Sequence, residues 1–427
     1  MAKLKPKNKS KKSLKAISKQ LRNAKPPIES HEFRERAGID VVKTKDEKDY
    51  YPGLVVPSCT HGKCLLFTQT DPQNPSKVLR WFGCALHRSP KLCSFKCAWP
   101  NKTKIEPITK EVKIKTSSRD YLPEKVEEFL SVPPQKFYFC KKCVDVFQTE
   151  AHFHPVQGPF KSNSDLLQFL PAIQNDSSQA QYWFAQDAIK LLFDSTESSG
   201  IKEYICIGTP QFFKYAKDQG KKAFLLDIDN RFKAFFRNTE FAQYNMINNE
   251  FLDERKHFEK FFKGCKKPVI VCDPPFGAFI KALIWSLKDI VEKCPVSMEY
   301  IIALPYFLDK HLYRTMPEIK MLDYMVPYQN HPTFKNGKKS PVRFFTTIDR
   351  EQFKLSPPLY KYCKECKRYV TIENRHCSTC KNCTSRDGLA VKHCGYCSRC
   401  VPEKYQHCNK CNKCSFKNRC HSKEEKE

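Results

Sequence analysis

Short apolar runs alternate with helix-length segments between residues 160 and 355. Five runs rich in β-branched and aromatic residues, each bounded by turn residues, lie at 203–208, 223–229, 268–276, 299–307 and 342–348. Residues 179–194 have the apolar spacing of an amphipathic helix entered from a polar loop. Nearly continuous apolar strands separated by helices are typical of a parallel sheet that is covered on both faces. The pattern therefore predicts an α/β domain with a mostly parallel sheet over residues 160–355.

The residues Asp273-Pro274-Pro275-Phe276 directly follow one of these apolar runs. Ligands of parallel sheets bind beyond the carboxyl ends of the strands, which is where this loop is expected to lie. The Asp273 carboxylate and the Pro274 carbonyl can accept the two protons of a planar amino group, while Phe276 stacks on its ring. The two prolines stiffen the loop and remove competing N–H groups. These four residues are therefore the predicted catalytic loop.

The last 65 residues contain sixteen Cys and His residues, which divide into four interleaved sets of four. Cysteines two residues apart suit tetrahedral zinc, because one turn offers two thiolates and a distant pair closes the site. The rhythm resembles the interleaved zinc fold of DHHC palmitoyltransferases, but Asp-His-His-Cys is absent and no apolar run reaches ~18 residues. We expect a structural zinc domain over 360–422 rather than a disulfide cluster. The predicted sets are Cys363, Cys366, His376 and Cys383; Cys377, Cys380, His393 and Cys400; Cys394, Cys397, His407 and Cys414; and Cys408, Cys411, Cys420 and His421.

Two further zinc units are predicted before the α/β domain. Residues 51–105 resemble a GRF-type zinc finger, a small β-sheet that offers aromatic and basic groups to single-stranded nucleic acid; Cys64 and Cys97 are surplus thiols that could replace an assigned ligand there. Residues 130–158 have the pattern of a two-Cys-two-His finger, with Phe147 between the pairs. The predicted ligands are Cys59, His61, Cys84 and Cys93 in the first unit, and Cys140, Cys143, His152 and His154 in the second. The whole chain would then bind about six zinc ions, each with four ligands.

The net charge of +29 and the pI of about 9.3 favour a polyanionic partner. Residues 1–50 form a Lys-rich arm and a charged linker, which we expect to be disordered. An anionic membrane is disfavoured because the chain has neither a basic amphipathic helix nor a lipidation signal. The 23 Cys, without a secretory signal, indicate thiolate-bound metal in a reducing compartment. Together with 13% aromatic residues, these features predict a nucleic-acid-binding zinc protein.

The Asp-Pro-Pro-Phe loop resembles the fourth motif of S-adenosylmethionine-dependent amino-methyltransferases, a Rossmann-like class I fold. On this resemblance Gly208 and Thr209 occupy the Gly-rich turn, although only one glycine is present. Asp227, at the end of the next strand, would accept hydrogen bonds from the cofactor ribose, and Asn245 and Met246 would contact its adenine ring. Asp273 would line the same pocket. The cofactor implied is S-adenosylmethionine.

The order of the zinc units around this domain resembles the CCHC-type zinc-finger rRNA adenosine N6-methyltransferases. The likeness runs from about residue 50 to the end and includes Gln-Tyr-Trp-Phe at 181–184, Leu-Leu-Asp-Ile-Asp, Tyr-Asn-Met and Asn330-His331. It implies that Gln181, Tyr182, Trp183 and Phe184 line the cofactor pocket, although their pattern alone indicates a helix face. It also implies methylation of adenosine in large-subunit rRNA, in the nucleus or nucleolus and the cytoplasm. We expect a monomer that cooperates with ribosome-assembly factors.

Two other functions fit parts of the sequence. Asp-Pro-Pro-Phe also serves protein-lysine methyltransferases, although a chain of charge +29 would repel a lysine-rich substrate. An inactive zinc-finger RNA-binding protein would have the same zinc units without binding the cofactor. The zinc tail has two possible roles: it can position RNA on a rigid basic surface, or it can pack on the sheet and stabilise it. The target adenosine does not follow from the sequence.

Overall fold

The computed structural model describes residues 39–43, 55–86 except 72 and 75, 93–99, 137–160 except 141, 144, 148 and 149, 172, and 181–416 except 293, 336, 338 and 339. Most of the predicted basic arm and linker, and the ligands Cys420 and His421, lie outside these residues. The chain divides into two compact units, Met1–Ile108 and Thr109–Glu427. In the described part of the chain no helix is long and apolar enough to cross a membrane.

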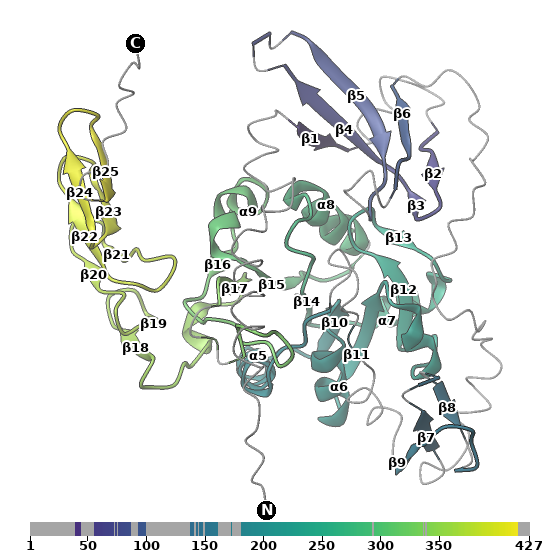
Figure 1. Cartoon of the computed structure of the whole chain (residues 1–427). Coiled ribbons are helices and arrows are strands. Elements are labelled where there is room, and N and C mark those ends of the chain that lie inside the picture. Colours follow the sequence, from purple (N-terminus) through teal and green to yellow (C-terminus); the bar gives the residue numbers. More distant parts are fainter. Residues whose placement is uncertain are drawn as a thin grey trace, which may run out of the picture. The chain divides into compact units, whose positions relative to one another are not determined.

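The second unit is built on an eight-stranded sheet in the order β13-β12-β11-β10-β14-β15-β17-β16 (Figure 1). Neighbours from β12 to β15 are parallel, and the strands at the two edges are antiparallel. The predicted mostly parallel sheet is confirmed. The strands are β10 (Glu203–Ile207), β11 (Lys222–Asp227), β12 (Phe241–Asn245), β13 (Glu250–Phe251), β14 (Pro268–Cys272), β15 (Glu299–Pro305), β16 (Lys320–Met321) and β17 (Val342–Thr346).

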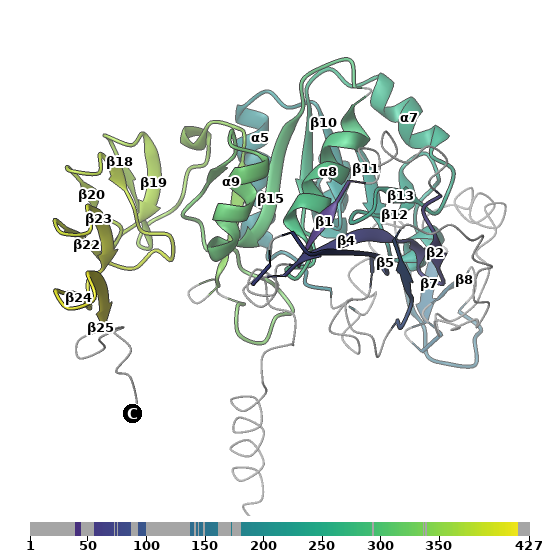
Figure 2. The ribbon, with the colours of Figure 1, turned by 90° about the horizontal axis from the view of Figure 1, so that it is seen from above.

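Helices cover both faces of the sheet (Figure 2). Side chains alternate across the sheet along each strand, so Tyr204 and Cys206 of β10 point to one face and Ile205 and Ile207 to the other. The first face packs on α5 (Gln186–Ser198) and α6 (Pro210–Asp218). The second packs on α7 (Lys256–Lys263), α8 (Ile280–Val291) and α9 (Asp309–Thr315). Short 3-10 helices η3 (Asn230–Ala234), η4 (Tyr306–Leu308) and η5 (Arg350–Gln352) complete the domain.

The prediction of a helix from residue 179 is wrong in its first turns, because α5 begins at Gln186. Residues 181–184 are extended, and Phe184 forms a β-bridge with Tyr328. The Trp183 carbonyl accepts from the Gln329 N–H (2.7 Å), and the Ala185 N–H donates to the Pro327 carbonyl (3.0 Å). Backbone bonds to a segment far along the chain therefore replace the bonds of a helical turn. Apolar spacing within the segment could not reveal this pairing.

The first unit contains a four-stranded antiparallel sheet in the order β1-β4-β5-β6. Leu66 and Phe82 form its core with Cys64 and Cys97. On the opposite face Phe67 stacks on Trp81, with ring centroids 5.7 Å apart. The strands are β1 (Ile39–Val42), β4 (Leu65–Thr70), β5 (Val78–Gly83) and β6 (Lys96–Ala98), and a hairpin of β2 (Ser58–Cys59) and β3 (Gly62–Lys63) accompanies them.

A three-stranded sheet, β8-β7-β9, follows at β7 (Phe137–Cys140), β8 (Asp145–Phe147) and β9 (Gln157–Phe160). Phe139 is fully buried in the core of the α/β domain and meets Phe235. The described residues of this finger contain strands and turns but no helix. The finger is thus tied to the α/β domain by a buried aromatic side chain.

The tail is a series of four β-hairpins. Each hairpin turn contains a Cys-x2-Cys pair, and the residue after the second Cys has a positive φ of 48° or 49°. These residues are Lys367, Lys381, Ser398 and Asn412, so the fourth copy shares the turn of the other three. The strands are β18 (Tyr360–Cys363), β19 (Arg368–Thr371), β20 (His376–Cys377), β21 (Asn382–Cys383), β22 (Val391–Cys394), β23 (Arg399–Pro402), β24 (Tyr405–Cys408) and β25 (Lys413–Phe416).

Candidate active site and zinc sites

The candidate active site lies at the carboxyl end of β10, where the chain order of the strands reverses. From β10 the chain proceeds to β11 and β12 on one side, and then returns to β14 on the other. Such a switch point leaves a crevice between the loops of the two central strands, which is the usual ligand site of open α/β sheets. The Asp273 N–H donates to the Ile207 carbonyl (3.1 Å), and the Thr209 hydroxyl donates to the Val271 carbonyl (3.2 Å). These bonds hold the two predicted loops side by side.

Gly208 has a φ of +67°, in the left-handed region. A Cβ at this position would lie 2.9 Å from the Asp273 carbonyl oxygen and 3.0 Å from Cε of Met246. Only glycine therefore allows the β10 turn to approach the β14 loop and the β12 exit this closely. A glycine is therefore required at position 208 for steric reasons, although the turn contains no second glycine.

Two carboxylates at the end of β11 differ in their partners. Asp229 is bound by Arg231, whose Nη2 lies 2.6 Å from its Oδ2, and by Nε2 of Gln181 (2.8 Å). Asp227 accepts from the backbone N–H of Asp229 (3.0 Å) and is 6% exposed. Burial, with the nearby Asp229 charge, raises the pKa of Asp227 to about 7. Asp229 therefore fixes the wall of the site, whereas Asp227 retains acceptor capacity for hydroxyl groups.

Asn245 ends β12 with a side chain that is 3% exposed. Its Oδ1 accepts from the Ile247 N–H (3.0 Å), but Nδ2 has no hydrogen-bond partner among the described residues. An unsatisfied buried donor costs ~1–3 kcal/mol, so its presence beside a crevice indicates a ligand that accepts from it. With the Gly208 turn and the Asp227 carboxylate, this donor fits S-adenosylmethionine, whose ribose hydroxyls donate and whose adenine ring accepts.

The 181–184 segment pairs with residues 328–331, and the pair reaches the strand ends through the bonds of Gln181 to Asp229 and of Tyr328 to Asp273. Asn330 accepts from the Trp183 N–H through Oδ1 and donates to the Gln181 carbonyl through Nδ2, both at 2.8 Å. Tyr182 is 38% exposed and packs on the His331 ring, with centroids 4.7 Å apart. Gln181 is anchored to Asp229, as described, while Trp183 and Phe184 are buried in the core. Long-range bonds thus place Gln181 beside Asp229 and Tyr182 beside His331, whereas Trp183 and Phe184 belong to the core, and their part in a cofactor pocket stays a prediction.

Within the catalytic loop, Asp273 retains partial solvent access, Pro274 is buried and Pro275 is exposed, while Phe276 packs against the core. The Tyr328 hydroxyl donates to Oδ1 of Asp273 (3.2 Å). Burial raises the pKa of Asp273 well above its usual range, and this hydrogen bond partly offsets the increase. Burial, with the nearby Asp273 charge, also raises the pKa of Tyr328 well above its usual value. Sequence reasoning missed Tyr328, which lies 55 residues from Asp273 and in no motif.

Five of the six predicted zinc sets converge in the structure, with all four ligand atoms of each within 4.8 Å of one another. Ligands around tetrahedral zinc lie about 3.3–3.8 Å apart, given bonds of about 2.0–2.3 Å. The sulfurs of Cys380 and Cys400 are 3.7 Å apart, and Cys366 Sγ lies 3.2 Å from His376 Nδ1. These clusters fit zinc. The sixth set cannot be compared in full, because Cys420 and His421 lie outside the described residues.

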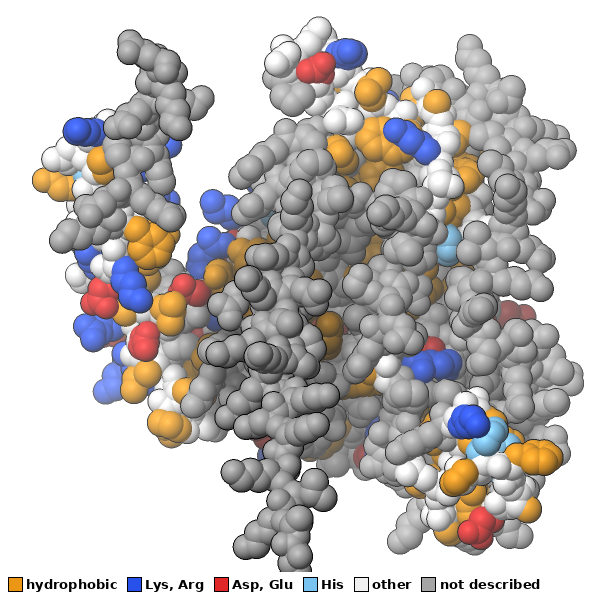
Figure 3. Space-filling model, in the orientation of Figure 1, with side chains coloured by type: hydrophobic (Ala, Val, Ile, Leu, Met, Phe, Trp, Pro, Cys, Tyr) orange, Lys and Arg blue, Asp and Glu red, His pale blue; other side chains and the backbone are white. Residues whose placement is uncertain are grey.

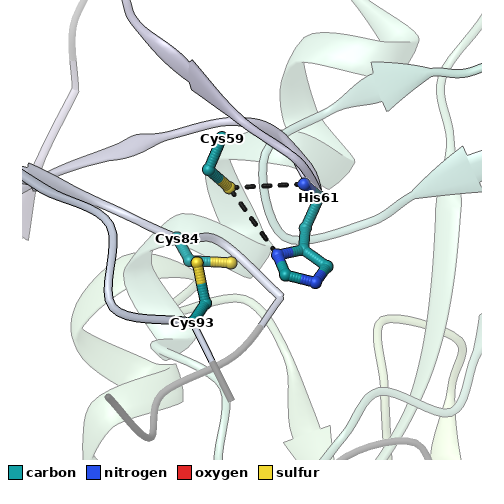
Figure 4. A group of neighbouring side chains, drawn as sticks. All are labelled: Cys59, His61, Cys84 and Cys93. Atoms are coloured by element: carbon teal, nitrogen blue, oxygen red, sulfur yellow. Dashed lines mark hydrogen bonds between the residues drawn. The ribbon is translucent and has the colours of Figure 1, made fainter. Parts of the chain in front are cut away.

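In the first unit the cluster consists of Cys59, His61, Cys84 and Cys93 (Figure 4). Cys59 Sγ lies 3.9 Å from His61 Nδ1 and accepts from the His61 N–H (3.4 Å). Both surplus thiols are outside this cluster, buried in the small core. Cys64 forms a hydrogen bond with Cys59 that raises the Cys64 pKa, and burial raises the pKa of Cys97. The four ligand atoms that converge are therefore those of the predicted set.

In the second finger, Cys143 Sγ lies 3.2 Å from His152 Nε2 and 3.3 Å from His154 Nδ1. Phe147 packs on the His152 ring with centroids 4.1 Å apart, as expected for the core residue between the pairs. In the tail, each of the three converging zinc sets joins the Cys pair of one hairpin to a His and a Cys of the next. Zinc would therefore link successive hairpins rather than close each one separately.

The first tail hairpins are also bound to the α/β domain. Arg368 forms a buried ion pair with Asp323, whose Oδ2 also accepts from Nδ2 of Asn374 (2.6 Å). Arg343 of β17 is 1% exposed and donates from Nη2 to the Asp387 carbonyl (2.8 Å). These contacts support the second of the two expected tail roles, in which the tail packs on the catalytic domain.

An Asp-Pro-Pro-Phe loop at this switch point, next to the strand-end carboxylate of Asp227, is the arrangement of an S-adenosylmethionine-dependent amino-methyltransferase. A family model described as probable N6-adenine methyltransferase matches residues 175–347. The chain belongs to the rRNA N6-adenosine-methyltransferase family, as its similarity to curated members shows. It is 31% identical to rRNA N(6)-adenosine-methyltransferase ZCCHC4 of Xenopus tropicalis over 378 residues, covering 80% of this chain and 76% of the relative. Identity to the Homo sapiens protein of that name is 29% over 393 residues, covering 83% and 75% of the two chains.

Proposed function

We propose that this protein transfers a methyl group from S-adenosylmethionine to N6 of an adenosine in large-subunit rRNA. The observation that carries the proposal is the Asp273 loop, which lies beside Gly208 and whose carboxylate is oriented by Tyr328. The family supports adenine as the substrate base, and the names of the relatives support rRNA. A protein-lysine substrate has no comparable support.

When bound, S-adenosylmethionine supplies an electrophilic methyl group. The residues of the chain hold the adenine and its N6 amino group in position for the transfer. With Oδ1 engaged by Tyr328, Asp273 presents Oδ2 to one N6–H, and the Pro274 carbonyl accepts the other. Phe276, which is partly buried, supports the adenine ring after the base has left its stack. Much of the acceleration then comes from alignment.

The zinc units and the basic arm support binding to structured RNA. Phosphate contacts from Lys and Arg fix position and orientation without reading bases, and the net charge of +29 supplies them in excess. We further propose that the protein acts as a monomer in the nucleus, nucleolus and cytoplasm, with ribosome-assembly factors as partners. Size-exclusion chromatography with light scattering and imaging of the tagged chain test these two statements.

The decisive experiment incubates the purified protein with tritiated S-adenosylmethionine and either total RNA or total protein. We expect label in large rRNA and none in protein. Mapping N6-methyladenosine in rRNA from cells with and without the protein then identifies the adenosine. Label in protein alone would establish the lysine reaction, and failure to bind the cofactor in calorimetry would indicate an inactive RNA-binding protein.

A further inference from the structure

The third hairpin turn of the tail contains an exposed aromatic side chain. Tyr396 immediately precedes Cys397, the second Cys of its pair, and is 81% exposed. The other three turns have Glu365, Thr379 and Lys410 at the equivalent position. Because polar residues serve this position elsewhere in the same repeat, the turn itself does not require an aromatic ring. With 81% of its surface exposed, Tyr396 contributes little apolar burial to the fold, which leaves most of the ring available to a ligand.

The ring of Tyr396 rests on a rigid support. It stacks on the His407 ring with centroids 4.7 Å apart and an interplanar angle of 21°. His407 is held in turn by its zinc set, with Nδ1 3.3 Å from Cys397 Sγ. One face of Tyr396 is therefore covered by a metal-anchored imidazole, while most of the side chain remains open to solvent. A ring fixed in this way loses little entropy when a second ring stacks on it.

The charge around Tyr396 is strongly positive. Between residues 391 and 416 the exposed basic side chains outnumber the exposed acidic ones five to one. They are Lys392, Arg399, Lys404, Lys410 and Lys413, against Glu403. Within the described part of the chain, none of the five basic groups forms an ion pair. Lys and Arg side chains are also spread along the visible face of the tail in Figure 3.

We propose that Tyr396 is a stacking platform for an unpaired RNA base, with the neighbouring Lys and Arg side chains binding the flanking phosphates. Sequence-specific and single-strand RNA recognition commonly pairs aromatic rings with basic side chains, because every base has a π-face and every nucleotide a negative charge. A protein partner would leave five unpaired cations to be desolvated, unless it were itself strongly acidic. This inference deepens the proposed function, since it names a second RNA contact outside the catalytic crevice.

The test measures affinity of the full-length, zinc-loaded protein for a fluorescent single-stranded oligoribonucleotide and for a fully paired duplex, without cofactor. Tyr396→Ala should weaken single-strand binding about fivefold or more, with little change for the duplex. Tyr396→Trp and Tyr396→Phe should restore it. Thr379→Ala, at the equivalent position of another turn, is the matched control and should bind as the wild type does.

Salt dependence separates stacking from charge. Tyr396→Ala should lower affinity equally at all salt concentrations, whereas Lys392→Ala should reduce the slope of log affinity against log salt by about 0.7 for a single strand. Zinc content and the melting temperature show whether each variant is folded. Unchanged single-strand affinity in a folded Tyr396→Ala variant, or no rescue by Trp and Phe, would overturn the platform. Methyl transfer is assayed separately, so a protein that binds RNA through Tyr396 but transfers no methyl would refute only the proposed function.

Discussion

The catalytic crevice and the zinc tail place their side chains by different physical means. Around the crevice, fully buried strands such as β10 and β14 lie between two large apolar clusters. In the tail, the apolar cluster of the first hairpins consists of Cys363, Val370 and Cys383, two of which are zinc ligands. Apolar burial therefore organises the first region, and metal coordination organises the second.

The boundary between these two modes lies within the tail. The first hairpins of the tail share buried polar bonds with the catalytic domain, such as the ion pair of Arg368 with Asp323, whereas the exposed basic groups around Tyr396 lie on the later hairpins. The first hairpins thus contribute to the stability of the catalytic domain, and the later hairpins are available for RNA. Four experiments test this division, and they differ in the size of the effect expected.

The largest effect is expected at Asp273. Asp273→Ala removes an acceptor needed in the transition state, so single-turnover methyl transfer should fall at least ~100-fold. RNA affinity and zinc content should remain near wild type, because the residue lies in the crevice and not in the tail. Asp194→Ala removes an exposed carboxylate of α5 and serves as the control. Activity within a few-fold of wild type would show that Asp273 has another role.

Arg368→Ala is a substitution in the tail that should destabilise the catalytic domain. It leaves the Asp323 carboxylate, whose side chain is 1% exposed, without its charge partner. Breaking a buried ion pair in this way typically costs ~3–5 kcal/mol. The catalytic domain should therefore lose stability in chemical denaturation although the substitution is in the tail. Arg399→Ala, at an exposed tail position, is the matched control. Equal stability of the two variants would mean that the tail does not support the enzyme.

Tyr328→Phe should have a smaller effect that depends on pH. Loss of the hydrogen bond to Asp273 raises the Asp273 pKa further, because the bond favours the carboxylate. The acid limb of the pH–rate profile should therefore move to higher pH by about one unit, with partial recovery in alkaline buffer. Tyr324→Phe, on the same segment, is the control, since its ring packs on Phe344. An unshifted limb would remove Tyr328 from the mechanism.

The smallest effect is expected at the far end of the tail. Elemental analysis of the intact protein should approach about six zinc ions per chain, given four ligands for each. Cys411→Ala should remove about one of them while leaving catalytic-domain stability unchanged, since its set is the last along the tail. Cys366→Ala should remove one ion and also weaken the catalytic domain. A wild-type value of two or three would contradict the interleaved arrangement.

Sequence patterns predicted the elements of this protein that depend on local spacing. The apolar runs correspond to β10, β11, β14, β15 and β17. A strand that is buried on both faces of a sheet consists almost entirely of apolar residues, so it can be recognised in the sequence. Zinc sets could be read in the same way, since a Cys-x2-Cys turn places two thiolates regardless of the rest of the chain. The extended form of residues 181–184 could not be predicted, because their apolar spacing also suits a helix.

From the sequence alone, the class of fold and five of the six zinc sets were predicted correctly, because periodicity and metal geometry act over a few residues. The catalytic role of the Asp-Pro-Pro-Phe loop stays a prediction. Tertiary structure alone decided three other features. It brought Tyr328 to Asp273, left Nδ2 of Asn245 unpaired beside the crevice, and paired Arg368 with Asp323 across 45 residues. The first and third are contacts between polar groups far apart in the chain, and the energetic consequence of all three depends on burial that only the folded molecule provides.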